Sequence, residues 1–119
     1  MTVTGIDHVQ VAAPAGCEAE ARAFYIGLLA LEELPKPEPL AARGGCWFRA
    51  GAQELHVGVE DPFTPARKAH PSFLVTDLDA LAAKLTEAGF AVTYDDLIPG
   101  TRRFETGDPF GNRLEFRQA

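Results

Sequence analysis

Seven stretches of the chain have the apolar content, or the alternation of apolar and polar residues, that is typical of β-strands. They cover residues 4–13, 46–50, 53–59, 70–75, 90–94, 102–106 and 112–117. Gly51 and Ala52 separate the second and third stretches, which predicts a hairpin there. The prolines at positions 35, 37 and 39 exclude a longer regular element and favour a short edge strand followed by a loop.

Two further stretches repeat their apolar residues every three to four positions, which predicts amphipathic helices. In the first, residues 18–29, the apolar face is formed by Ala21, Phe24, Tyr25 and Leu28. In the second, the face is formed by Leu78, Leu81, Ala82 and Leu85. Thr76 or Asp77 can cap this second helix, and Gly89 is expected to end it.

Each half of the chain therefore follows the order strand, helix and three strands, which predicts an α+β protein built from two βαβββ modules. The modules span residues 1–60 and 68–119, and the segment 61–67 between them, which holds two prolines, forms a connector. The 119 residues fit a single domain that is large enough to bury a hydrophobic core.

Histidine and glutamate recur at matching places in the two halves. His8 lies in the opening strand of the first half, 46 residues before Glu54 in its last strand. His70 lies in the opening strand of the second half, 45 residues before Glu115 in its last strand. Because the halves otherwise share little identity, the common spacing points to a structural repeat with a shared site.

Strand alternation predicts that these four residues and His56 lie on the face of the sheet opposite to the apolar residues. Imidazoles and carboxylates gathered on one face need a cation or mutual pairing. Neutral imidazoles with carboxylates suit Mn, Fe, Co, Ni or Zn, and such a set leaves coordination positions open for a substrate. The expected ligands of this divalent transition metal are His8, Glu54, His70 and Glu115.

Each of these residues also has a structural interpretation. A single histidine on a strand is more often structural than a metal ligand, and Glu115 can pair with Arg113 or Arg117 on its own face. His56 has no counterpart in the second half, where Arg117 stands at the matching step. It could therefore replace Glu54 as a ligand, act as a general base or form a pocket wall.

The candidates for substrate binding are His56, Trp47, Arg49 and Phe104. The arginines at positions 49, 102 and 103 could hold an anionic substrate, although charged residues at strand edges are more often simply solvated. Trp47 and Phe104 could form the walls of a pocket, with core packing as the alternative.

Composition and charge narrow the range of partners. With 11 Lys and Arg against 17 Asp and Glu, the net charge of −6 repels phosphate backbones, so nucleic-acid binding is not expected. The two cysteines lack a CxxC spacing and are expected to be free thiols, which excludes a cysteine-type zinc site. No apolar run approaches the roughly 20 residues that span a bilayer, and the N-terminal residues lack the features of a secretory signal. We therefore expect a cytoplasmic chain without membrane contact.

Five segments carry motifs of a known superfamily. The most specific is Asp108-Pro109-Phe110-Gly111-Asn112-Arg113-Leu114-Glu115-Phe116, and the others are Gly5-Ile6-Asp7-His8-Val9, Ala23-Phe24-Tyr25, the strand that opens at His70, and Asp77-Leu78-Asp79-Ala80-Leu81. These segments resemble the vicinal oxygen chelate superfamily, which includes glyoxalases, fosfomycin- and bleomycin-resistance proteins and extradiol dioxygenases. The resemblance covers nearly the whole chain and implies a glyoxalase-like fold, in which paired βαβββ modules form a cupped mixed sheet. It also implies a homodimer that acts on a small molecule, and in many members of this length the ligands of one metal site come from two chains.

The resemblance assigns metal-ligand positions residue by residue. His8 matches the ligand of the first strand, His70 that of the fifth strand, and Glu115 that of the last strand. Glu54 matches the fourth-strand glutamate of glyoxalase I, which the fosfomycin thiol transferases lack. His56 departs from both patterns, which leaves the fourth ligand open between Glu54 and His56.

The resemblance and the ligand set together favour a divalent-metal-dependent enzyme of the lyase or isomerase, thiol transferase or dioxygenase type. Its ion would bind two neighbouring oxygens of a small substrate, and Glu54 would be the catalytic residue that carries a proton. The first alternative is a bleomycin-resistance-like protein that binds and sequesters a small molecule without catalysis. The acidic charge and the aromatic residues Trp47, Phe48 and Phe104 motivate it. The second alternative is a structural dimer with a vestigial site.

Overall fold

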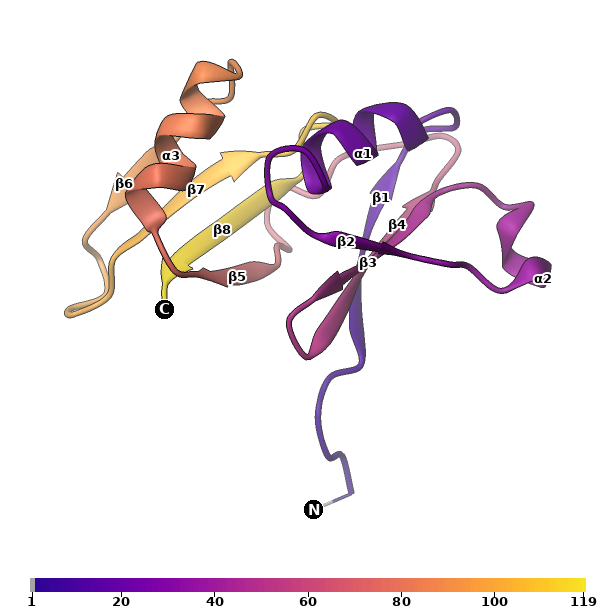
Figure 1. The fold of residues 1–119 in the computed structure, drawn as a ribbon, viewed down its shortest axis with the longest axis horizontal. Helices are drawn as coiled ribbons and strands as arrows, with labels where there is room; N and C mark the ends of the chain where they lie inside the picture. The colour runs from indigo at the N-terminus through magenta and orange to yellow at the C-terminus, as the bar shows by residue number, and fades with distance from the viewer. Residues whose placement is uncertain (1) are drawn as a thin grey trace. The chain divides into compact units, whose positions relative to one another are not determined.

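The chain divides into two compact units, Met1–Thr64 (unit 1) and Pro65–Ala119 (unit 2), which are labelled by their elements in Figure 1. The computed structural model describes residues 2–119. Each unit follows the order strand, helix and three strands, apart from one short extra helix, which confirms the α+β class and the two βαβββ modules. Within residues 2–119 no helix is both long enough and apolar enough to cross a membrane.

Unit 1 contains a four-stranded mixed sheet with the strand order β1-β4-β3-β2. Its elements are β1 (His8–Ala13), α1 (Glu18–Tyr25), β2 (Glu32–Leu34), α2 (Glu38–Ala41), β3 (Cys46–Ala50) and β4 (Gln53–Val59). β1 runs parallel to β4, whereas the other neighbouring strands are antiparallel. The apolar face of α1 contacts β3, and there Tyr25 and Phe48 stack with their ring centroids 5.5 Å apart. Cys17 and Cys46 are free thiols, as expected, and both are buried.

Unit 2 contains a second four-stranded mixed sheet, in the order β5-β8-β7-β6. Its elements are β5 (Ser72–Val75), α3 (Leu78–Glu87), β6 (Thr93–Asp95), β7 (Arg103–Gly107) and β8 (Arg113–Gln118). The core of the unit includes Leu78, Leu85, Phe104, Leu114 and Phe116. Asp77 caps α3 by accepting a hydrogen bond from the Ala80 backbone N–H at 3.0 Å, and Gly89 follows the helix with φ at +94°. Both ends of this helix are therefore where the sequence predicted them.

The first helix is shorter than its apolar periodicity predicts, because the backbone leaves the α-helical ladder after Tyr25. The N–H groups of Gly27 and Leu29 donate to carbonyls five residues earlier rather than four. A Cβ atom at Gly27 would lie 2.3 Å from the Ala23 carbonyl oxygen, so only glycine allows this widened turn. Leu28 keeps the helical spacing in the sequence, yet it lies beyond the end of α1 at Tyr25.

Three strands begin two or more residues later than the apolar pattern predicts, since each ladder starts where a partner strand is available. One of them is β6, which starts at Thr93, opposite Glu105, and not at residue 90. The first register pair of β1 is His8 with Glu54, so residues 4–7 precede the strand. β5 begins at Ser72, which places His70 just before the strand and not within it. Pro71 separates the two and has no N–H group to contribute to a ladder.

A short helix, α2, replaces part of the loop that the prolines led us to expect. It begins at Glu38, directly after Pro37, so that Pro39 stands in its first turn. A proline there removes no helical hydrogen bond, because the first N–H groups of a helix have no partner within it. The predicted edge strand is present as β2.

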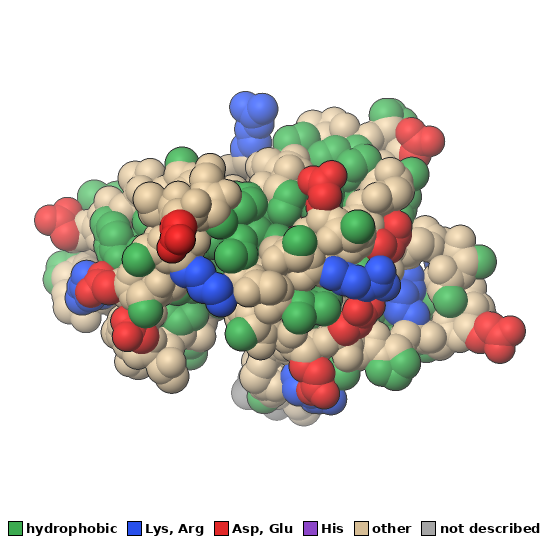
Figure 2. Space-filling view, turned by 45° about the horizontal axis from the view of Figure 1, so that its top comes forward, with side chains coloured by type: hydrophobic (Ala, Val, Ile, Leu, Met, Phe, Trp, Pro, Cys, Tyr) green, Lys and Arg blue, Asp and Glu red, His purple; other side chains and the backbone are tan. Residues whose placement is uncertain are grey.

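Oppositely charged side chains are paired on the surface of both units. Arg22 contacts Glu33 and Arg102 contacts Asp79, each at 2.9 Å. On the face shown in Figure 2, blue side chains accordingly lie singly, several of them beside red ones, rather than in one continuous basic band. Exposed pairs of this kind each contribute up to about 1 kcal/mol, so the stability of the fold depends mainly on its apolar cores.

Candidate functional site

One face of the unit 2 sheet carries the polar side chains of its strands, because β7 and the first part of β8 alternate between polar and apolar residues. The opposite face packs Phe104, Leu114 and Phe116 into the core. The unit 2 polar face is formed by His70, Ser72, Arg103, Glu105, Arg113, Glu115 and Arg117. In the ladder between β7 and β8, Glu105 stands directly opposite Glu115, and Arg103 stands directly opposite Arg117.

Glu115 is the centre of this face and is only 2% exposed. Its carboxylate accepts hydrogen bonds from the Ser72 hydroxyl at 2.6 Å, from Arg117 Nε at 2.6 Å and from the Arg103 guanidinium. Burial by itself raises the pKa of Glu115, but these three donors outweigh it and lower the pKa to about 2. Glu115 is therefore ionised at neutral pH, and its expected pairing with Arg117 is present, whereas Arg113 contacts a different carboxylate.

His70 has one ring nitrogen free for a ligand and aimed at Glu115. Its Nδ1 atom lies 2.9 Å from the Lys68 carbonyl oxygen, and because a carbonyl only accepts, Nδ1 must carry the proton. In the neutral ring the lone pair is then on Nε2, which lies 3.6 Å from Glu115 Oε1. Metal-binding histidines typically donate their second ring N–H to a carbonyl or carboxylate in this way.

A third ligand group, Glu105, joins this pair, and the sequence analysis missed it. One ligand atom each of His70, Glu105 and Glu115 lie within 4.8 Å of one another. Two ligands that bind one transition-metal ion at about 2.1 Å are about 3.0–3.4 Å apart, so small side-chain shifts would let these groups share an ion. The signal was the alternation of β7, which puts Glu105 in phase with Arg103 and opposite Glu115.

In the structure arginines neutralise Glu105, Glu115 and the neighbouring Asp95. Glu105 pairs with Arg113 through two guanidinium nitrogens, and Asp95 pairs with Arg103 at 2.9 Å. A metal ion at this face would therefore take over carboxylate oxygens that guanidinium groups now hold. The donor set of one imidazole and two carboxylates fits a divalent transition metal.

The unit 1 polar face has the same position in its own sheet and a different chemistry. It is formed by His8, Gln10, Trp47, Arg49, Glu54 and His56, which are register partners on β1, β4 and β3. Three of their rings form one continuous stack, with His56 between His8 at a centroid distance of 4.0 Å and Trp47 at 4.1 Å. This stack leaves His56 only 5% exposed, although its strand position is on the polar face.

A hydrogen bond to a carboxylate orients each of the two histidines of this face. His56 Nε2 lies 2.9 Å from Glu54 Oε1, and His8 Nδ1 lies 2.9 Å from Asp7 Oδ2. Because an ionised carboxylate only accepts, both ring nitrogens donate, and neutral His8 keeps its lone pair on Nε2. His8 therefore has the same free ring nitrogen as His70, and Glu54 has a single hydrogen-bond donor where Glu115 has three.

The structure separates the four substrate-binding candidates. Phe104 is fully buried and packs against Phe116 at 5.2 Å, so it belongs to the core and does not line the polar face. Its strand position is out of phase with Arg103 and Glu105, which explains the correction. Trp47 and His56 lie on the unit 1 polar face, and Arg49 is exposed with Glu32 at 3.5 Å.

The repeat of histidine and glutamate differs in register between the units. His8 stands opposite Glu54 in the ladder of unit 1, whereas Ser72 stands opposite Glu115 in unit 2. His70 lies two residues before that position. The two histidines thus match in sequence spacing but not in their ladder positions. In unit 2 the ladder position that corresponds to His8 is occupied by Ser72, whose hydroxyl donates to Glu115.

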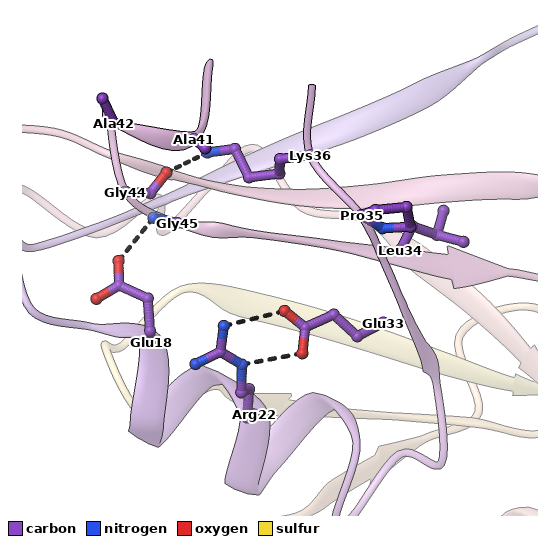
Figure 3. Close-up of a pocket in the computed structure, with 10 residues that line it drawn as sticks. All are labelled: Glu18, Arg22, Glu33, Leu34, Pro35, Lys36, Ala41, Ala42, Gly44 and Gly45. Carbon is purple, nitrogen blue, oxygen red and sulfur yellow. Dashed lines mark hydrogen bonds and ion pairs between the residues drawn. The ribbon is translucent and has the colours of Figure 1, made fainter. Parts of the chain in front are cut away.

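A pocket of about 640 Å³ lies elsewhere in unit 1, among α1, β2, α2 and the segment that precedes β3 (Figure 3). Its polar groups are largely paired with one another. Arg22 binds Glu33 through two nitrogens, and Glu18 accepts from the Gly45 backbone N–H at 2.6 Å. None of the predicted site residues lines this pocket, so it is separate from both polar faces.

The comparisons with known proteins agree with this architecture. No protein-family model matches the chain, and no curated protein sequence matches it. Among solved structures, a glyoxalase family protein from Bacillus anthracis is 53% identical, with coverage of 99% of this chain and 97% of that chain and a TM-score of 0.95. A lactoylglutathione lyase from Agrobacterium tumefaciens is 20% identical, covering 100% and 96% of the two chains, with a TM-score of 0.76. TnmS3, an antibiotic binding protein from Streptomyces sp. CB03234, is 23% identical, covering 99% and 98%, with a TM-score of 0.75. The last two similarities show the fold alone.

Proposed function

Because this chain belongs to the glyoxalase family, within the vicinal oxygen chelate superfamily, we propose that it is a divalent-metal-dependent enzyme that acts on a small substrate chelated through two neighbouring oxygens. The observation that carries the proposal is the orientation of His70. Its Nδ1 atom is tied to the Lys68 carbonyl, and its Nε2 atom faces Glu115 Oε1 at 3.6 Å. In the neutral ring the Nε2 lone pair faces an ionised carboxylate, and a cation shared by the two groups would stabilise this arrangement.

The proposed ligands are His8, Glu54, His70 and Glu115. Each unit has one histidine whose Nε2 atom carries the lone pair in the neutral ring and one carboxylate on its own polar face, and imidazole together with carboxylate suits Mn, Fe, Co, Ni or Zn. Glu105 is close enough to Glu115 to serve as an additional ligand. His56 is better suited to positioning than to ligation, because its Nε2 atom donates to Glu54 and both faces of its ring are covered.

The bound ion would act as a Lewis acid that polarises the two chelated oxygens and stabilises negative charge on them. Glu54 is the proposed proton carrier. Its carboxylate is partly exposed and has one side-chain donor, whereas Glu115 is buried under three donors and is held in its ionised form. His56 orients the Glu54 carboxylate through its hydrogen bond at 2.9 Å. This division of labour favours lyase or isomerase chemistry, in which a proton moves between neighbouring carbon and oxygen atoms.

We further propose a homodimer, as the resemblance implies. A second candidate function is binding without catalysis, which the name of TnmS3 suggests for a protein of this fold. The specific observation in its favour is the ring stack of Trp47, His56 and His8, which offers a flat aromatic surface beside a polar face. Phe48 and Phe104 give it no support, since both are fully buried.

Elemental analysis of the untagged chain, purified without chelator, tests the proposal. We expect about one transition-metal ion per site in the wild type and loss of at least nine tenths of it in His70→Ala. His70 lies outside the β5 ladder, so this variant should keep its fold. Glu87→Gln, at an exposed position at the end of α3, is the matched control and should keep the ion.

Two results would count against metal-dependent chemistry. The first is a wild type that takes up none of Mn, Fe, Co, Ni or Zn after add-back, and the second is unchanged metal content in His70→Ala. The binding function would instead be favoured if the chain binds an aromatic drug tightly, if a chelator does not weaken this binding, and if Trp47→Ala abolishes it.

A further inference from the structure

Two guanidinium groups from neighbouring strands share the carboxylate of Glu115. Arg117 Nε lies 2.6 Å from Oε2, and the Arg103 Nη1 atom donates to Oε1. The two arginines are register partners on β8 and β7, and like charges placed directly opposite each other destabilise a ladder. The shared carboxylate offsets this repulsion, so neither arginine is merely a solvated surface charge.

A second carboxylate fixes Arg103 on the unit 2 polar face. Asp95 accepts from the Nε and Nη2 atoms of Arg103, each at 2.9 Å, in a bidentate pair. This pair fixes the guanidinium and leaves its Nη1 atom to contact Glu115. Only 12% of the Arg103 side chain is exposed, so the group is held in place before any ligand arrives.

The charges of this face are balanced before a metal binds. Arginines 103, 113 and 117 face the carboxylates of residues 95, 105 and 115. A divalent cation at Glu115 adds two positive charges and takes up carboxylate oxygens that now accept from Arg103 and Arg117. An anion beside the ion would offset part or all of this added charge and would accept the hydrogen bonds that the carboxylate no longer takes.

We propose that the substrate is a small oxyanion, whose acidic group lies next to its chelating oxygens, and that Arg103 and Arg117 bind this group. The inference rests on the proposed function, because the arginines are released only when Glu115 binds a metal. A 2-hydroxy- or 2-oxocarboxylate has the required chemistry: it chelates through one carboxylate oxygen and the neighbouring oxygen, and its second carboxylate oxygen accepts from guanidinium. Arginine suits this task because its planar fork matches a carboxylate.

The other candidate arginines are paired with other carboxylates. Arg113 is held by Glu105 through two nitrogens, and Arg102 is held by the exposed Asp79. Arg49, a candidate from the sequence, is an exposed residue of unit 1 that pairs with Glu32. Arg103 and Arg117 are therefore the two of these guanidinium groups that contact Glu115.

Oxalate is the probe, because it is a dianion that chelates through neighbouring oxygens. Its affinity for the Mn(II)-loaded full chain is measured by water-proton relaxation and by calorimetry. We expect a loss of at least tenfold in Arg117→Gln and in Arg103→Gln, while Mn(II) affinity is unchanged or higher. Arg102→Gln is the matched control and should bind both Mn(II) and oxalate as the wild type does.

Arg117→Lys distinguishes loss of the guanidinium from a folding defect, because lysine keeps a positive charge beside Glu115 but lacks the planar guanidinium. We expect its oxalate affinity to lie between those of the wild type and Arg117→Gln. One result would overturn this inference and leave the proposed function intact. In it, all three variants of Arg103 and Arg117 bind Mn(II), and their oxalate affinity stays within twofold of that of the wild type. A wild-type chain that binds no Mn(II) would overturn the proposed function and this inference with it.

Discussion

The charge of Glu115 has a measurable effect on the stability of unit 2. Replacing Glu115 by glutamine keeps the shape of the side chain and removes the negative charge that Ser72, Arg103 and Arg117 now surround. The variant therefore leaves two arginines opposite each other in the ladder without their shared partner. We expect it to be strongly destabilised at neutral pH, in metal-free protein.

The magnitude follows from the lowered pKa. The native pKa of Glu115 is about 2, compared with the ordinary value of 4.5. Since each pKa unit corresponds to about 1.4 kcal/mol, the ionised carboxylate contributes about 3 kcal/mol to the free energy of unfolding. Removal of one partner from a buried ion pair costs a similar amount, about 3–5 kcal/mol. This is a large fraction of the roughly 5–15 kcal/mol by which a domain is stable.

The sign of the pH dependence is fixed by the direction of the shift. A carboxyl group whose pKa is lowered by folding stabilises the native state above its unfolded pKa and loses that contribution as pH falls towards its native pKa. The difference between the wild type and Glu115→Gln should therefore be about 3 kcal/mol at pH 7, about half of that at pH 3, and close to zero at pH 2.

Urea unfolding in the presence of a chelator, at pH 7 and pH 3, measures this difference. Asp79→Asn serves as the control, because Asp79 forms a comparable pair with Arg102 in an exposed position. That variant should lose less than about 1 kcal/mol. If Glu115→Gln is as destabilised at pH 3 as at pH 7, its effect comes from packing rather than charge. If it is not destabilised at pH 7, the ion pairs around Glu115 make no net contribution.

Two further predictions concern unit 1. His56→Gln keeps a donor for Glu54 but removes the central ring of the stack. The fluorescence emission of Trp47, the single tryptophan of the chain, should therefore shift to longer wavelength. His56→Phe keeps an aromatic ring there and should leave the emission wavelength unchanged. Equal shifts in both variants would contradict the role of the stack. Gly27→Ala places a Cβ atom 2.3 Å from the Ala23 carbonyl oxygen and should lower the free energy of unfolding by about 1–3 kcal/mol. Gly5→Ala, with no atom within 4 Å, should change it by less than about 0.5 kcal/mol in the same chemical denaturation assay.

The local patterns of the sequence predicted most elements because they are set by neighbouring residues. The alternation over Gln53–Val59 gives β4 its bounds, and the cap at Asp77 with Gly89 gives α3 its ends. The early end of α1 depends on one close approach of Gly27 to a backbone carbonyl, and periodicity does not report such contacts. The late start of β5 depends on which residues of β8 are available as partners, and this is a property of the ladder.

The sequence could predict on which face of the sheet the candidate site residues lie, but not which side chains they contact. Alternation correctly placed Glu115 and Arg117 on one face, and it also held the information that Phe104 points away from it. The burial of His56 could not be predicted, because it arises from cross-strand neighbours that stack on both sides of the ring. The network of Arg103 with Asp95 likewise depends on the register between β6 and β7.

The chemical difference between the two units bears on which residue of the proposed site is suited to moving a proton. A strict repeat would give both carboxylates the same environment, and then neither could be assigned a separate role. Instead Glu115 is surrounded by two arginines and a hydroxyl, which hold its pKa near 2 and keep it from carrying a proton at neutral pH. Glu54 has one side-chain donor, the imidazole of His56. In the proposed site Glu54, oriented by His56, is thus the ligand suited to proton transfer, and Glu115 is the ligand suited to holding an ion.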